Sequence, residues 1–315
     1  MKTKSALKDL TLIQIIERFP TDETARQHLE SIRWKNGIVC PHCKCSDQAQ
    51  FALRSANPAK KVRSGLRFCS NCQSQFTVTI GTVFESTHIP LRKWLIAWYL
   101  ICSSKKGISS LQLQRLLELG SYRSALFMAH RIRHALKDES FTDKLTGIVE
   151  ADEHHVGGFG TGVGSGNRKH RNPIMALVER GGKVRSKVLP TVNGANLRQA
   201  VRDNVQSGSE LHTDMNHGYK ELAGEYTHKS VKHMAGEFSR HEGENVVTTA
   251  SVESFFSLLK RGVMGTFHHI SAQHLPLYLA EFDHRHNCRK MSDGERTDAG
   301  LRKVEGKRLI YKTKA

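Results

Sequence analysis

The sequence predicts a multidomain protein whose last large part is an α/β domain. Helical spacing of apolar residues dominates the first 140 positions outside one cysteine-rich segment. After residue 147, short β-branched runs alternate with amphipathic stretches. A length of 315 residues is enough for two or three domains. The changes in character place the divisions at 1–36, 37–85, 86–140, 141–290 and 291–315.

The first division reads as two short helices. Leu10, Ile13 and Ile16 recur at helical spacing, and Pro20 ends that element. Thr21 is a residue type that caps a following helix. At the end of the second division, residues 76–80 alternate in polarity and are β-branched, which predicts a strand.

The second division carries two C-x-x-C pairs with 25 residues between them. Two intervening residues let both sulfurs of a tight turn reach one ion, and zinc takes four tetrahedral thiolate or imidazole ligands. Two such turns predict a zinc ribbon holding a structural Zn²⁺. Cys45 and His42 are spare and either could substitute, but the two pairs are the simpler ligand set. That set is Cys40, Cys43, Cys69 and Cys72.

Residues 86–140 contain three helical stretches. A short helix, a turn at Gly120 and a longer basic helix capped by Ser121 fit a helix-turn-helix. The alternative is an ordinary helical hairpin with a solvated basic face. On the last helix, the candidate DNA contacts are Arg123, Arg131 and Arg133.

Charge indicates the kind of partner. Forty-eight Lys and Arg against thirty Asp and Glu give a net charge of +18, which suits a polyanion such as DNA. No apolar run approaches the roughly 18 residues of a membrane span, and no apolar signal-peptide core follows the N-terminus. We therefore expect a cytoplasmic protein that does not insert into membranes.

The fourth division reads as an α/β domain with a basic loop. Strands are expected at 148–152, 174–178, 184–189 and 210–213, and helices at 196–205, 251–262 and 272–286. A glycine pair, Gly181 and Gly182, predicts a hairpin between the second and third strands. Residues 157–166 are rich in Gly and Ser and predict a mobile loop. Its basic continuation offers DNA contacts at Arg168, Lys169 and Arg171. Residues 291–315 are expected to form a basic tail with little structure of their own.

Three acids in this domain stand where phosphodiester chemistry could use them. Asp152 and Asp214 each end a strand, and Glu253 lies in the first turn of a helix. Carboxylates brought together from separate elements are ligands for Mg²⁺ or Mn²⁺. Glu150 and Glu153 are rivals for the first position. Glu153 should point to the opposite face of the strand from Asp152, and Glu150 lies about 7 Å back along the same face.

Three segments, 149–158, 211–214 and 251–262, resemble the carboxylate motifs of DDE transposases of bacterial insertion sequences. The third is the most specific. The front end is also similar to the group with an N-terminal zinc ribbon and an ISXO-type transposase domain, so the resemblance covers roughly residues 15 to 290. Thr248 and Ala250 depart from it, because many relatives carry His and Asn there.

The resemblance implies a ribonuclease H-like catalytic domain in which Asp152, Asp214 and Glu253 bind the magnesium. It implies a transposase that binds the terminal inverted repeats of its element, cuts a strand and joins it to target DNA, and that works as a homo-oligomer assembled on DNA. Lys260 follows Glu253 by seven residues on one helix face and, with neighbouring Arg261, is a candidate phosphate contact.

Two other readings of the same residues stay open. A non-catalytic DNA-binding regulator or a domesticated transposase would use the zinc ribbon and the helix-turn-helix, but would give no role to the three acids. A nuclease would use the acids to cut DNA without joining it. DNA cleavage with and without a target separates these classes.

Overall fold

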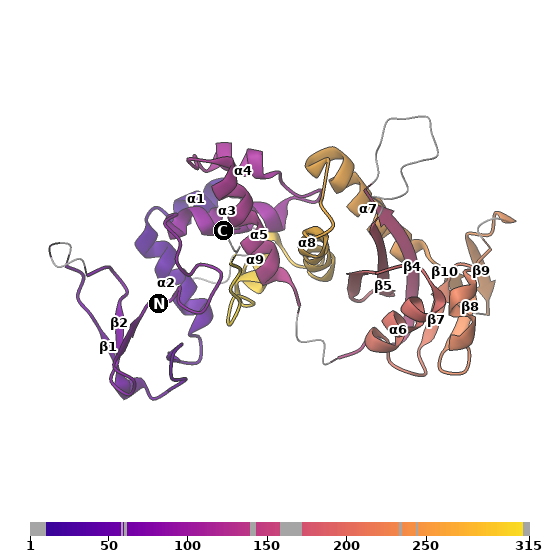
Figure 1. Ribbon diagram of the computed structural model, residues 1–315, viewed down its shortest axis with the longest axis horizontal. Helices are drawn as coiled ribbons and strands as arrows, with labels where there is room; N and C mark the ends of the chain where they lie inside the picture. Colours follow the sequence, from indigo (N-terminus) through magenta and orange to yellow (C-terminus); the bar gives the residue numbers. More distant parts are fainter. Residues whose placement is uncertain are drawn as a thin grey trace. The chain divides into compact units, whose positions relative to one another are not determined.

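A computed structural model of the chain divides into two compact units, each of which is described by itself (Figure 1). The first unit consists of residues 1–104, 108–136 and 290–315, and the second of residues 105–107 and 137–289. The structure describes residues 11–57, 59, 62–138, 143–157, 172–232, 235–243 and 245–310. Within those ranges, no helix combines the length and the apolar character that a membrane span requires.

The first unit is mainly helical and carries one small sheet. Its two N-terminal helices begin at capping boxes, in which Thr11 and Thr21 accept the hydrogen bonds of backbone N–H groups that have no helical partner. The predicted cap at Thr21 is therefore confirmed. The described elements of this unit are α1 (Leu12–Arg18), α2 (Asp22–Arg33), η1 (Gln48–Gln50), β1 (Phe51–Leu53), β2 (Arg67–Cys69), β3 (Ser74–Phe76), α3 (Leu91–Ser103), α4 (Ser110–Leu116), α5 (Tyr122–Leu136) and α9 (Asp293–Leu301).

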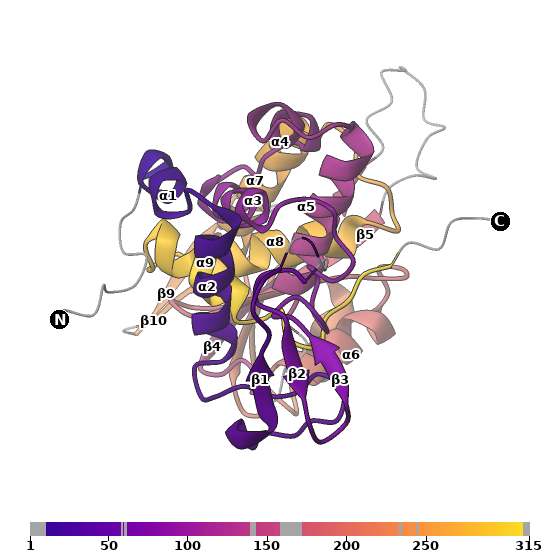
Figure 2. The same cartoon turned by 90° about the vertical axis from the view of Figure 1, so that its left-hand side faces the viewer.

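The small sheet lies largely within the cysteine-rich segment, and Figure 2 shows its three antiparallel strands side by side in the order β1-β2-β3. The strand predicted at 76–80 is wrong, because β3 ends at Phe76. Threonine hydrogen bonds curl the chain there: the hydroxyl of Thr82 donates to Thr79 O at 2.6 Å, and Ile80 N donates to Thr77 O at 3.2 Å.

The core of the first unit surrounds α3, whose residues from Trp94 to Cys102 are all buried. The C-terminal segment also belongs here, so the unstructured tail expected at 291–315 is wrong. Ser292 caps α9 with a capping box, and Leu301 and Val304 are only 1% exposed. Apolar contacts to the core order a segment whose composition looked like that of a basic tail.

The second unit is built on a mixed five-stranded sheet. Its strand order is β6-β5-β4-β7-β8, with β6, β5 and β4 antiparallel and β4, β7 and β8 parallel. The described elements are β4 (Ile148–Val156), β5 (Asn172–Glu179), β6 (Val184–Val188), α6 (Gly194–Asn204), β7 (Glu210–Thr213), η4 (His217–Leu222), β8 (Thr227–Ser230), β9 (Ser239–Glu242), β10 (Asn245–Thr248), α7 (Ala250–Gly262), η6 (Val263–Phe267) and α8 (Leu275–Asn287).

Helices cover both faces of this sheet. Ile174, Ala176 and Val178 of β5 pack into a core with α7 and α8, while Met175 and Leu177 pack against α6. The predicted hairpin between β5 and β6 is confirmed. Gly181 turns it with φ of 72°, in the left-handed region that glycine adopts without strain.

Candidate metal centres

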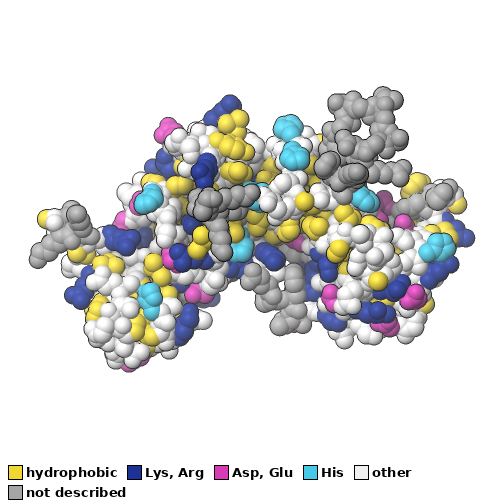
Figure 3. Space-filling model, in the orientation of Figure 1, with side chains coloured by type: hydrophobic (Ala, Val, Ile, Leu, Met, Phe, Trp, Pro, Cys, Tyr) yellow, Lys and Arg dark blue, Asp and Glu magenta, His cyan; other side chains and the backbone are white. Residues whose placement is uncertain are grey.

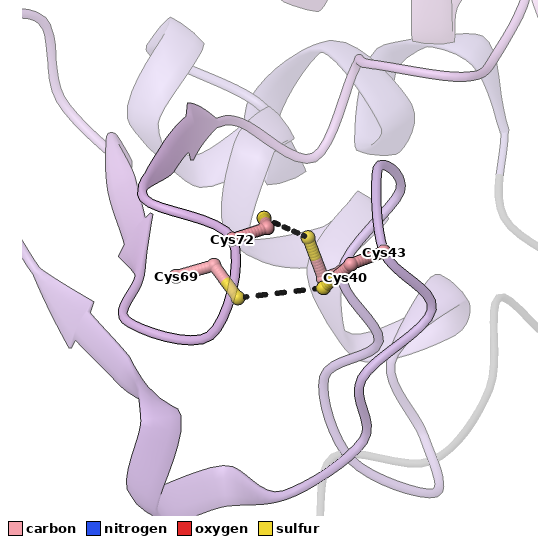
Figure 4. Close-up of side chains that lie close together, drawn as sticks. All are labelled: Cys40, Cys43, Cys69 and Cys72. Carbon is pink, nitrogen blue, oxygen red and sulfur yellow. Dashed lines mark hydrogen bonds between the residues drawn. The ribbon is translucent and has the colours of Figure 1, made fainter.

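Four cysteine sulfurs of the first unit gather in one place, all within 4.8 Å of one another (Figure 4). The Sγ atoms of Cys40 and Cys72 are 3.7 Å apart, and so are those of Cys43 and Cys69. Tetrahedral zinc with Zn–S bonds of about 2.3 Å requires sulfur separations of about 3.8 Å. The observed spacing therefore fits one Zn²⁺ held by four thiolates.

Both cysteine pairs sit on similar turns. The residue after each pair, Lys44 and Gln73, has a positive φ of 61° and 55°, which bends the chain so that both sulfurs face inward. The Asn71 side chain donates to the sulfur of Cys43 at 3.5 Å and lowers the pKa of that thiol to about 6. Burial raises the pKa of Cys40 to about 12. A cation replaces the proton on that buried thiol when it binds.

The spare side chains Cys45 and His42 are not members of the four-sulfur cluster, and His42 is exposed. The ligand set expected from the two C-x-x-C pairs is thus the one that the fold brings together. Its closed, four-sulfur character is typical of a structural zinc site.

In the second unit, the pairing of β4 with β7 brings two of the predicted acids together. The strands are parallel, and each β7 residue is paired with the β4 residue 62 positions earlier, as in Ile148 with Glu210. Continuing that register puts Asp214 beside Asp152. Their carboxylates, with that of Glu153, have oxygens within 4.8 Å of one another.

Glu153 was expected to point to the opposite face of the strand from Asp152. Its carboxylate nevertheless lies close to those of Asp152 and Asp214. Its cross-strand partner is Met175, which packs toward α6, so the side chain does start on that face. The β4–β7 pairing, however, stops at Glu150. Beyond that point Glu153 has no paired β7 residue beside it, and the Tyr219 hydroxyl donates a hydrogen bond to its carboxylate.

Clustering changes the acidity of these groups. Burial, together with the charges of Glu153, Asp214 and Glu253, raises the pKa of Asp152 to about 7. Burial also raises the pKa of Glu153, against the hydrogen bond from Tyr219. Opposite ligands of an octahedral Mg²⁺ lie about 4.2 Å apart. The carboxylate oxygens of the cluster lie within 4.8 Å of one another, so small side-chain movements would bring them to the spacing that a divalent cation requires.

Glu253 lies in the first turn of α7, near this cluster. It is not one of the three residues whose carboxylate oxygens all lie within 4.8 Å of one another. Its carboxylate accepts a hydrogen bond from the hydroxyl of Thr249 at 2.7 Å, and its charge contributes to the raised pKa of Asp152. The structure thus brings Asp152 and Asp214 together and leaves Glu253 close by on the covering helix.

Comparison with known proteins finds two matching domains in this chain. Residues 144–287 match the ISXO2-like transposase domain, and residues 20–75 match the transposase zinc-ribbon domain. The chain thus matches a transposase zinc ribbon followed by an ISXO2-like transposase domain. It is also 27% identical over 290 residues to a protein of Halobacterium salinarum described as an uncharacterized protein in transposable element ISH50, covering 86% of this chain and 92% of the relative.

The helix α7 of the transposase domain carries two basic side chains in addition to Glu253. Lys260 and Arg261 are both exposed, and Arg261 donates to the carbonyl of Ser257 at 3.2 Å. Burial lowers the pKa of His154 on β4, and the positive charge of Lys260 lowers it as well. The ammonium group of Lys260 therefore lies near the strand that carries Asp152. The loop residues Arg168, Lys169 and Arg171 lie outside the described residues.

The three arginines expected to contact DNA from α5 differ in exposure. Arg123 is exposed near the start of the helix. Arg131 is buried, and its guanidinium donates to the carbonyls of Val83 and Glu85 at 3.0 Å each. Arg133 is 0% exposed. The second half of α5 is enclosed by the helical core, so Arg131 and Arg133 are part of the interior of this unit. Of the three arginines, Arg123 is the one whose side chain is accessible to a DNA phosphate.

Sequence reasoning missed the roles of two acids and one tyrosine in the transposase domain. Glu153 and Tyr219 belong to the acidic site, and the signal available for Glu153 was its place directly after Asp152. Glu150 is fully buried, and its carboxylate accepts hydrogen bonds from Arg180 and from the start of α7. A buried, fully bonded carboxylate is not free to bind a cation, so Glu150 is not a ligand.

Proposed function

We propose that this protein is a DNA transposase that binds the terminal inverted repeats of an insertion sequence and catalyses metal-dependent strand cleavage and strand transfer. The observation that carries the proposal is the gathering of Asp152, Glu153 and Asp214 at adjacent parallel strands of the transposase domain. A mixed sheet covered on both faces, with acids on its central strands, supports a ribonuclease H-like catalytic domain.

The reaction exchanges phosphodiester bonds. Water attacks a phosphate at the element's end, breaks one P–O bond and leaves a 3′-hydroxyl. That hydroxyl attacks a phosphate of the target DNA in line. This joining step makes one phosphodiester bond, breaks one in the target and releases a target 3′-hydroxyl, whereas the first step only breaks a bond by hydrolysis. Bound Mg²⁺ or Mn²⁺ would activate the attacking oxygen and stabilise the leaving one.

The chain's own residues have distinct tasks in this scheme. Asp152, Asp214 and Glu253 hold the cations, and Glu153 stays beside them through its bond with Tyr219. Lys260 binds a DNA phosphate. It lies seven residues after Glu253 on the same helix, about 10 Å further along the same face.

DNA binding is assigned to the first unit and to basic residues of the second. Lys and Arg side chains are spread over the face of the molecule seen in Figure 3, interspersed with acids. We propose that α4 and α5 act as a helix-turn-helix, since the exposed start of α5 presents Tyr122 and Arg123. The zinc ribbon adds a second contact, and the protein works as a homo-oligomer on paired ends.

Mapping of DNA breaks tests the proposal. Full-length protein, Mg²⁺, labelled ends of the encoding element and a supercoiled target should yield 3′-hydroxyl ends and then joined products. Asp152→Asn should bind the ends but neither cut nor join them. Asp203→Asn is the control, because Asp203 is exposed on α6 and pairs with Lys187 away from the cluster.

The alternatives predict other products. Binding of the ends without any cleavage would point to a regulator or a domesticated transposase, and cleavage without joining would point to a nuclease. Cleavage and joining that survive in Asp152→Asn would contradict the assignment of the acidic site.

A further inference from the structure

Three buried or half-buried polar residues stand two positions before the three acids of the proposed site. Their side chains meet in one hydrogen-bond network through Arg180 and Glu150. Each of the three acid-bearing elements, β4, β7 and α7, therefore contributes one member of this network. The pairs are Glu150 with Asp152, His212 with Asp214, and Ser251 with Glu253.

Glu150 ties β4 to the start of α7. One carboxylate oxygen accepts from the backbone N–H groups of Ser251 and Val252, at 2.7 and 3.3 Å. The other accepts from the Ser251 hydroxyl at 3.0 Å. Negative charge at a helix N-terminus is favourable, and the described N-cap, Thr249, makes no side-chain cap bond of its own. The carboxylate of β4 thus caps the helix that carries Glu253.

Arg180 ties the same carboxylate to β7 and β10. Its Nε and Nη2 donate to Glu150 at 3.1 and 2.9 Å. Its Nη1 donates to the carbonyl of Val246 at 2.8 Å, and Nη2 also lies 3.2 Å from Nδ1 of His212. One planar guanidinium thus bridges three elements, a geometry that its fixed fork of donors allows.

His212 completes the network from β7. It is fully buried and directly paired with Glu150 in the parallel ladder. Its Nδ1 lies near two donors, Arg180 and the N–H of Thr248, and also 3.3 Å from the carbonyl of Thr248, while its Nε2 lies 2.7 Å from the carboxylate of Glu210. The two donors and the carboxylate favour one tautomer. The ring therefore accepts at Nδ1 and donates at Nε2, which holds it in one orientation.

We propose that Glu150, Arg180 and His212 form a positioning clamp that sets the distance between Glu253 on α7 and the two aspartates on the sheet. The inference rests on the proposed function, because it concerns the cations that those acids hold. A two-residue step along a strand keeps the same face, so a shift of Glu150 or His212 moves the neighbouring ligand with it. None of the clamp residues touches the cation or the DNA.

The test measures Mn²⁺ binding rather than activity alone. Full-length protein with its zinc in place is titrated with Mn²⁺, and free Mn²⁺ is followed by electron paramagnetic resonance. Glu150→Gln keeps an oxygen for the two N–H groups of α7 but turns an amide donor toward Arg180. It should weaken Mn²⁺ binding about tenfold or more, the usual effect of losing a residue that orients a metal ligand.

The chain offers a matched control on another helix. Asp283 of α8 accepts from Ser186 N at 3.0 Å and from its hydroxyl at 2.7 Å, the same kind of tie between helix and strand. Asp283→Asn should lower the melting temperature as Glu150→Gln does, yet leave Mn²⁺ affinity within about twofold of wild type, because the tie joins α8 to β6, neither of which carries one of the three acids.

A second variant keeps the inference testable if Glu150→Gln does not fold. Arg180→Lys retains the charge but not the fork, and it should weaken Mn²⁺ binding several-fold. Wild-type affinity in a folded Glu150→Gln or Arg180→Lys protein, or an equal loss in Asp283→Asn, would overturn the clamp. If Asp152→Asn binds Mn²⁺ as wild type does, the metal site itself is wrong and the proposed function fails with it.

Discussion

The substitution Asp152→Asn should stabilise the metal-free protein, and a divalent cation should shrink that gain. Burial and neighbouring acids raise the pKa of Asp152 from 3.8 to about 7 in the metal-free fold. A carboxyl group with a raised folded-state pKa loses stability as pH rises from the unfolded pKa to the folded one. The wild-type protein should therefore lose stability between about pH 4 and pH 7, and Asn should remove that loss.

The magnitude follows from the two pKa values. Each pH unit between 3.8 and about 7 is worth about 1.4 kcal/mol, so ionised Asp152 costs the metal-free fold about 4 kcal/mol at pH 8. Asn keeps the oxygen that accepts from Glu153 N at 2.8 Å. We expect the metal-free variant to be more stable than wild type by up to that amount at pH 8, and by little at pH 4.

The assay must report the second unit. Amide hydrogen exchange of peptides from β4 and β5 does so, because protection measures the free energy of local opening. Tryptophan fluorescence would report the first unit, since all three tryptophans lie there. Buffers should be free of Mg²⁺ but contain no chelator, which would strip the zinc. The tryptophans are Trp34, Trp94 and Trp98.

Adding the cation should shrink the difference in stability between the two proteins. At a concentration 100-fold above its Kd, Mg²⁺ stabilises the wild type by about 2.7 kcal/mol, and the variant by much less. Asp203→Asn should follow wild type throughout. The reasoning is refuted if metal-free Asp152→Asn is no more stable than wild type at pH 8, or if Mg²⁺ protects both proteins equally.

Three further outcomes concern the first unit. Purified protein should hold about one Zn²⁺ per chain by metal analysis, and Cys72→Ser should lose it; zinc-free wild type would contradict the ribbon site. Arg123→Ala should weaken binding to the element's ends and lower the slope of log affinity against log salt by about 1, whereas an unchanged slope would exclude a phosphate contact there. Leu301→Ala should destabilise this unit by about 2–5 kcal/mol in urea unfolding followed by tryptophan fluorescence, because Leu301 is 1% exposed; no loss would mean that α9 does not belong to the core.

Elements governed by local rules could be predicted from the sequence. The hairpin at Gly181, the cap at Thr21 and the helix beginning near Ser251 depend on residues close together in the chain. The two C-x-x-C turns are local as well, and only their meeting is a long-range event. Residue type and spacing were enough for these features.

The misses arose where distant contacts decided the outcome. Nothing in residues 291–315 signals that Leu301 and Val304 pack against helices from the start of the chain. The burial of Arg131 and Arg133 likewise depends on what surrounds α5, since basic side chains on a helix usually face solvent. Burial of a charged residue follows from tertiary packing and leaves little trace in the local pattern.

The acidic site combines features that local sequence predicts with features that depend on distant contacts. The sequence could nominate Asp152 and Asp214 as candidate ligands, although the expectation that Asp152 ends its strand is wrong, because β4 continues to Val156. The proximity of the two acids depends on the parallel register of β4 and β7, which no local pattern determines. That register also decides the roles of their neighbours. Because it pairs Glu150 with His212, Glu150 is enclosed among hydrogen-bond donors and cannot serve as a ligand. Because it ends there, Glu153 can turn toward the carboxylates of Asp152 and Asp214. Two acids that flank Asp152 in sequence thus acquire opposite roles from one strand pairing.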